Sequence, residues 1–278
     1  MSKQALRDQL IALPLTAITC VLLVLLLWGE IHLLNHVSSE KIVAHLRIQD
    51  IVVGMTIYLK TSIDFAIFIG RLMDRNRGLK GRIAIEIGTA LGNAVGTFAI
   101  LALWTFFKEI DWLLGIMVFI AGLVLFRLAE EGLEHVNHEN RRYPAWFRFG
   151  VRRFERALLF INGLTHPLLS RVMPATNVEA KAKKTFLALL AAAFVVPFIL
   201  GLDDFAGYVP LFNVINVFGF ATGVFIGHMV LNILLYLSPR RTIKAVKNPV
   251  ISLLGSIAFV LLGIWGLIEA FKLLFLHL

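Results

Sequence analysis

Residues 201–212, with the sequence GLDDFAGYVPLF, carry two adjacent aspartates inside one of the most apolar parts of the chain. An earlier stretch, TSIDFAIFIG at residues 61–70, has the same Asp-Phe-Ala core. The two cores begin at Asp64 and Asp204, 140 positions apart. A carboxylate in hydrocarbon costs at least about 2.5–3.5 kcal/mol, so it normally faces a cavity or a partner. The question is why such a motif occurs twice.

The composition indicates an integral membrane protein. The 278 residues are 58% hydrophobic and have a mean hydropathy of +0.81, well above soluble domains. Apolar runs of about 20 residues recur, which is the length needed to cross a bilayer as a helix. The single cysteine, Cys20, excludes an intramolecular disulfide.

The apolar runs predict an all-α protein with seven transmembrane helices. The first run follows Lys3 and Arg7 and lacks a small-residue cleavage site, so we interpret it as a retained helix and not as a signal peptide. The predicted spans are 10–29, 50–72, 83–107, 112–129, 185–208, 211–237 and 250–272.

The basic residues predict the orientation. With these spans, 22 of the 27 lysines and arginines lie on one side of the membrane and four on the other. The positive-inside rule therefore places the N-terminus in the cytoplasm and the C-terminus outside, in the plasma (inner) membrane. The net charge of +9 then needs no nucleic acid, because it is an orientation signal beside anionic lipid of the inner leaflet.

Three short matches recur in the same order, one per predicted span. The offsets are 140 for Asp-Phe-Ala, 135 for the Gly-x-x-x-Gly segments and 140 for Leu-Leu-Gly. Since each copy has three spans, the copies would cross the membrane in opposite directions, which is a common construction of secondary transporters. The matched segments begin at Asp64 and Asp204, at Gly88 and Gly223, and at Leu113 and Leu253.

The predicted organisation has four parts. An N-terminal transmembrane helix occupies residues 1–40, and the first three-helix repeat occupies 41–134. A cytoplasmic loop with a basic amphipathic helix spans 135–184, and the second repeat spans 185–278. The aspartates would thus occur twice because the protein contains two copies of one half-site.

The candidate site begins with the aspartates of the repeated motif. Asp64 and Asp204 hold matching positions, while Asp203 either shares their site or points to the outer surface. Pro197 removes one helical hydrogen bond before Asp204, and Gly201 loosens the same helix. A broken helix beside a carboxylate offers oxygen ligands for a hard cation, although a plain proline kink is the alternative.

Two predicted spans add polar side chains at helical spacing. The third span carries Glu86 and Asn93 on one stripe, and the sixth carries His228 and Asn232 four residues apart. These side chains either complete a cation shell or relay protons, or they simply form interhelical hydrogen bonds. Lys60, four residues before Asp64, either neutralises that aspartate or acts as a gating counter-charge.

The loop at 135–184 contains apolar residues at helical spacing with arginines between them. This pattern predicts a basic amphipathic helix lying on the inner leaflet, with partner docking as a further option. The apolar positions are Tyr143, Phe147, Val151, Phe154, Leu158 and Ile161.

The two Asp-containing motifs in inverted three-helix repeats resemble the lysine-exporter superfamily. The segment from Asp203 to Phe212 is most similar to the cadmium-resistance branch, beside the tellurium-resistance membrane proteins and other cation exporters. The resemblance covers the second to seventh spans and implies that Asp64 and Asp204 are cation ligands in proton-coupled export. Phe65 and Phe205 stand where that branch has Asn, and Lys60 adds a positive charge beside the implied site.

The leading hypothesis is a secondary transporter that exports a divalent metal cation and holds no cofactor. One alternative is export of an amino acid or another small solute, and a second is a non-transporting scaffold that acts through the basic loop. No spacing typical of a nucleophile and base or of zinc ligands stands out, so we expect no enzyme. A homodimer is possible, since the sequence does not determine the oligomeric state.

Overall fold

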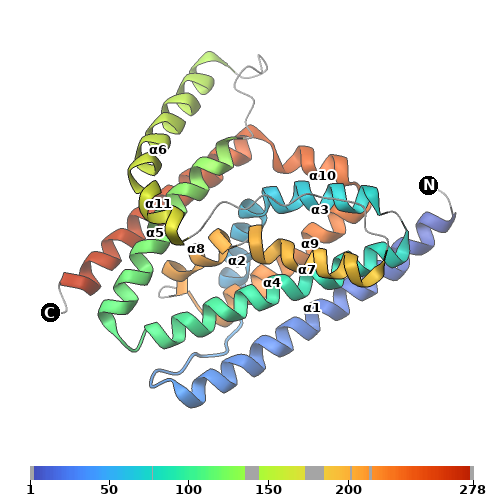
Figure 1. The fold of residues 1–278 in the computed structure, drawn as a ribbon, viewed down its shortest axis with the longest axis horizontal. Coiled ribbons are helices and arrows are strands. Elements are labelled where there is room, and N and C mark those ends of the chain that lie inside the picture. Colours follow the sequence, from blue (N-terminus) through green and yellow to red (C-terminus); the bar gives the residue numbers. More distant parts are fainter. Residues whose placement is uncertain are drawn as a thin grey trace.

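The structure is a computed structural model that describes residues 3–76, 78–134, 144–172, 185–200, 202–212 and 215–275. All regular secondary structure in these segments is helical (Figure 1). The sequence predicted an all-α membrane protein, and an all-helical chain with several long apolar helices agrees with it.

Five described helices are long and apolar enough to cross a membrane. Each contains an apolar segment of 21 residues or more, whereas about 20 residues suffice for a bilayer. They are α1 (Lys3–Val37), α4 (Leu79–Phe107), α5 (Asp111–Glu134), α9 (Val217–Leu237) and α11 (Pro249–Phe275).

A sixth candidate span is a broken one. The helices α2 (Ile48–Thr61) and α3 (Ile63–Arg75) meet at Ser62 with a bend of 67°. The sequence predicted one continuous helix over 50–72, because no proline or glycine marks the bend. The described residues thus hold five or six candidate spans, where the sequence predicted seven.

The segment predicted as the fifth span is helical in the residues that the structure describes. It holds α7 (Phe186–Leu200) and the first part of α8 (Leu202–Phe212), and Gly201 lies outside the described residues. Pro197 lies inside α7, which continues for three residues beyond it.

Three helix pairs build the core of the bundle. The helix α4 packs mainly against α7, α2 packs against α9, and α5 packs against α11. The helices α4 and α9 run antiparallel: Arg82 at the start of α4 donates to the carbonyl oxygen of Tyr236 at the end of α9, at 2.9 Å. Further along α4 and earlier in α9, the rings of Phe98 and Phe225 meet with centroids 6.0 Å apart.

Local sequence signals explain where several helices begin. Gly78, before α4, has a φ of 112°, a left-handed conformation that glycine adopts without a steric penalty. Asn216 caps α9 by accepting from the amide of Gly219 at 3.0 Å. Asn248 accepts from the amide of Val250 at 3.0 Å, with Pro249 as the first residue of α11.

The helix α6 (Ala145–Val172) lies at the margin of the bundle beside α5 (Figure 1). Its predicted apolar stripe packs onto α5, while the predicted position of the helix on the inner leaflet stays a prediction. Asn162 strengthens the contact by donating to the carbonyl oxygen of Phe126 at 3.2 Å and to the carboxylate of Glu130. The stripe residues in this contact are Phe147, Val151, Phe154, Leu158 and Ile161, while Tyr143 lies outside the described residues.

Candidate functional site

A network of buried polar side chains crosses the bundle between α2, α4 and α9. His228 is fully buried, and its Nδ1 lies 2.6 Å from the hydroxyl of Tyr58 on α2. Its Nε2 lies 3.2 Å from the amide nitrogen of Asn232, one turn along α9. The same amide nitrogen donates to the hydroxyl of Thr89 on α4, also at 3.2 Å. The polar residues of both predicted repeats therefore meet in one place.

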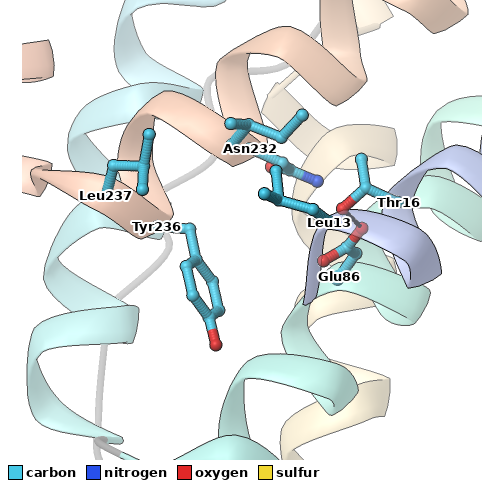
Figure 2. A pocket seen from close by; sticks show the side chains of 7 residues that line it. Leu13, Thr16, Glu86, Asn232, Tyr236 and Leu237 are labelled. Carbon is cyan, nitrogen blue, oxygen red and sulfur yellow. Dashed lines mark hydrogen bonds between the residues drawn. The ribbon is translucent and has the colours of Figure 1, made fainter. Parts of the chain in front are cut away.

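Glu86 extends this network to α1. Its carboxylate accepts a hydrogen bond from the hydroxyl of Thr16, and the hydroxyl of Thr89 donates to its backbone carbonyl at 3.1 Å. Figure 2 shows Thr16 facing the carboxylate, with the amide of Asn232 directed toward the same place. The hollow that these side chains line has a volume of about 10 Å³, about the size of a single water. A carboxylate, three hydroxyls, an imidazole and an amide thus lie close together in the buried part of the bundle.

Aromatic rings enclose the imidazole. The ring of Phe65 on α3 lies 5.4 Å from that of His228 between centroids, and the ring of Tyr58 lies 5.5 Å away. Both rings are buried. Because the only polar neighbours of the imidazole in the described segments are Tyr58 and Asn232, its two nitrogens need one donor and one acceptor partner. The arrangement fixes which tautomer the hydrogen bonds favour.

Two pairs of glycines make the same kind of helix contact. A Cβ at any of the four would press on the carbonyl oxygen of a residue in the partner helix, so the backbones touch directly. The contacts are Gly88 with Leu190, Gly92 with Phe194, Gly223 with Ile51 and Gly227 with Met55. The glycines of the two pairs are 135 positions apart and their partners are 139 apart. The α4–α7 and α2–α9 contacts therefore have equivalent registers.

Asn93 occupies the position on α4 that corresponds to His228 on α9 in this register. It is buried, with 1% of its surface exposed, and its side-chain nitrogen has no hydrogen-bond partner among the described residues. Its own carbonyl accepts from the hydroxyl of Thr97 at 2.9 Å. A buried hydrogen-bond donor is costly to leave unpaired, so we include the side-chain amide of Asn93 in the candidate site.

Of the aspartates in the repeated motif, the structure describes the side chain of Asp64 and not those of Asp203 and Asp204. Asp64 is exposed, whereas the residues on either side of it, Ile63 and Phe65, are buried. Asp203 and Asp204 belong to the first turn of α8, and their side chains lie outside the described part. The expected meeting of Asp64 and Asp204 thus stays a prediction.

Lys60 lies elsewhere than its spacing to Asp64 suggested. The two residues stand on opposite sides of the bend at Ser62, so the shared helical face assumed from the sequence does not exist. The stem of Lys60 crosses Gly255 of α11, and its Nζ is next to Gly132 of α5. That nitrogen is buried and has no hydrogen-bond partner among the described residues.

Sequence reasoning missed Thr16 and Tyr58. Thr16 lies in the first apolar run, for which the sequence predicted only a membrane helix, and Tyr58 precedes the repeated motif. No periodic pattern in the sequence marks these two residues, because each makes its hydrogen bond to a residue of another helix. A polar residue within a predicted span was the only sign available.

No group of three or more His, Cys, Asp or Glu residues able to hold a metal ion occurs among the described residues. The described site is therefore rich in amides and hydroxyls, with Glu86 and His228 as its titratable members. Comparison of the chain with protein-family models, with curated proteins and with solved structures gives no match.

Proposed function

We propose that this chain is a secondary transporter that exports a divalent metal cation in exchange for protons. The observation that carries the proposal is the buried network of Glu86, Asn232 and His228, which joins helices from both halves of the chain. Ionisable groups within membrane spans are costly and by default belong to a pathway or a relay. Such a position would agree with transporters built from repeats, which bind their cargo at the repeat interface.

The proposed architecture is a pair of inverted three-helix repeats preceded by α1. In this arrangement α2 and α3 together correspond to α7 and α8. The helix α4 corresponds to α9, and α5 corresponds to α11. The equivalent glycine registers support it, because the contacts of α4 with α7 repeat as those of α9 with α2. The antiparallel course of α4 and α9 supports the inversion, since equivalent helices must then run in opposite directions.

The proposed roles divide between proton and cation. Glu86 and His228 are the groups that can gain and lose a proton, and the hydroxyl of Thr16 holds the carboxylate. Asp203 and Asp204 at the start of α8, with Asp64, would supply the oxygen ligands that a divalent cation requires. The cation is the cargo in this proposal and not a resident cofactor.

A second candidate is export of an amino acid or another small polar solute. Its support is the composition of the network, in which hydroxyls and amides outnumber charged groups. Such groups recognise an organic solute by hydrogen bonds, whereas a divalent cation prefers carboxylate oxygens.

The test is the elemental content of cells that express the wild-type protein, Glu86→Gln or no protein, at matched levels of membrane insertion. The proposal predicts lower cellular content of one divalent metal with the wild type only. Asp204→Asn should abolish the same difference. Equal metal content in all cells would remove the cation cargo and leave the solute exporter and the scaffold as candidates. Unchanged export by both variants would exclude Glu86 and Asp204 from the transport pathway.

A further inference from the structure

A second hollow, separate from the polar network, lies between α2, α9, α11 and α10 (Pro239–Val246). Its volume is about 740 Å³, within the range of cavities that hold drug-sized ligands. Most of its lining is aliphatic. The aliphatic lining includes Leu59, Ile63, Leu231, Leu234, Ile251 and Leu254.

The cavity opens toward the side of the bundle. Among the residues that line it, Leu254 is 63% exposed and Ile251 is 54% exposed. Both lie on α11, a helix apolar enough to span the membrane, so their exposed surface faces lipid and not water. A ligand that enters here arrives from the bilayer.

One rim of the cavity is strongly basic. The helix α10 and the residue after it carry four cationic side chains and no acidic one, and Arg241 lines the cavity directly. Arg241 is exposed and makes no ion pair in the described part of the chain. The polar residues Ser238 and Thr242 also line the cavity. This rim therefore offers an uncompensated positive charge beside hydrogen-bonding groups.

We propose that this cavity binds an anionic phospholipid from the leaflet that borders α10. The acyl chain lies along the leucines of α9 and α11, and the phosphate accepts hydrogen bonds from Arg241. Basic pockets between transmembrane helices recognise anionic headgroups in this way, and each nearby basic residue adds to the attraction. The binding is independent of the transport proposed above, because no member of the polar network lines this cavity.

The test is native mass spectrometry of the purified full-length protein titrated with phosphatidylglycerol or with phosphatidylcholine. Arg241→Gln probes the headgroup contact, and Arg240→Gln is its control, since both residues are exposed on α10 but only Arg241 lines the cavity. Leu254→Trp fills the cavity, and Leu261→Trp is its control, seven residues further along α11 and equally exposed at 62%.

The wild type should bind its first phosphatidylglycerol more tightly than phosphatidylcholine. Arg241→Gln should weaken that first event about fivefold and Leu254→Trp should abolish it, while both controls bind as the wild type does. Free glycerol phosphate, which has the headgroup without the chains, should not displace the lipid. Equal binding of the two lipids, or equal effects in each variant and its control, would overturn the proposal.

Discussion

His228 is central to the candidate site, because each of its two ring nitrogens contacts a polar group of another residue of the network. Tyr58 reaches one ring nitrogen and Asn232 the other. A buried donor or acceptor that loses its partner costs about 1–3 kcal/mol, which exceeds the net gain of about 0.5–1.5 kcal/mol from making the bond. The geometry of the imidazole therefore depends on both neighbours.

Tyr58→Phe should lower the free energy of unfolding by about 1–2 kcal/mol, because it leaves the Nδ1 of His228 without its partner at 2.6 Å. Thermal or denaturant unfolding of the purified protein measures this change. A double-mutant cycle with His228→Gln isolates the pair. If the two single effects simply add, the hydrogen bond contributes nothing and the network is not coupled.

Glu109, in the turn between α4 and α5, ties down the loop that follows α1. The hydroxyls of Ser39 and Ser38 donate to its carboxylate and hold its pKa below the usual 4.5. A lowered pKa in the folded state stabilises the fold above pH 4.5 and loses that effect as the pH falls through the folded value.

Ser39→Ala should therefore reduce the melting temperature at pH 7, and its deficit relative to the wild type should shrink as the pH drops below about 4.5. Melting curves across this range check the prediction. A deficit that is independent of pH would show that Ser39 acts by packing and not through the carboxylate of Glu109.

The sequence predicted much of this network and none of its connections. Helical spacing singled out Glu86, His228 and Asn232, because a polar stripe on an otherwise apolar helix marks a face that needs polar partners. Thr16 and Tyr58 belong to no polar stripe that the sequence singled out, and the packing of α1 and α2 brings them to the site. Asp64 is exposed because α3 turns away at Ser62, and no residue type at that position predicts the bend.

At the scale of helices, the bundle packs largely by direct contact between helix backbones. Gly54 on α2 faces the carbonyl of Phe220 on α9, and a Cβ there would overlap that oxygen. Small residues permit such contact in membranes, where the hydrophobic effect does not drive helices together.

Gly54→Ala should destabilise the protein by about 1–3 kcal/mol, because two helix backbones must separate. Gly29→Ala on α1 is the control: no atom lies within 4 Å of the added carbon, and the change should be neutral or stabilising by up to about 1 kcal/mol. Unfolding of the two variants in the same detergent compares them. Equal stability of both would contradict close packing of α2 on α9.

The existence of most helices was predictable, and their bends and faces were not. Apolar length identified the five long helices, because a bilayer demands about 20 residues whatever their order. The stripe on α6 was also visible in the sequence, but its packing against α5 was not, because periodicity identifies an apolar face and not the element that it contacts. The Gly-x-x-x-Gly segments predicted close packing, and α7 and α2 proved to be their partners.

At the scale of the whole molecule, the inverted arrangement predicts which loops share a side. In a Cys20→Ser background, cysteines at Lys41 and Asp111 should react with a membrane-impermeant thiol reagent added outside intact cells. A cysteine at Lys244 should react only after the membrane is opened. All three positions are exposed, so access alone decides the result. Labelling of Lys244→Cys from outside would contradict the topology.

Proton movement coupled to a divalent cation tests the central claim most directly. The purified protein is placed in liposomes that contain a pH-sensitive dye, and divalent metals are added one at a time. We predict a metal-dependent proton flux with the wild type and with Glu40→Gln, whose carboxylate is exposed and outside the network. Glu86→Gln, with an unchanged melting temperature, should lose the flux. A full flux with Glu86→Gln, or none with the wild type for any metal, would contradict the account.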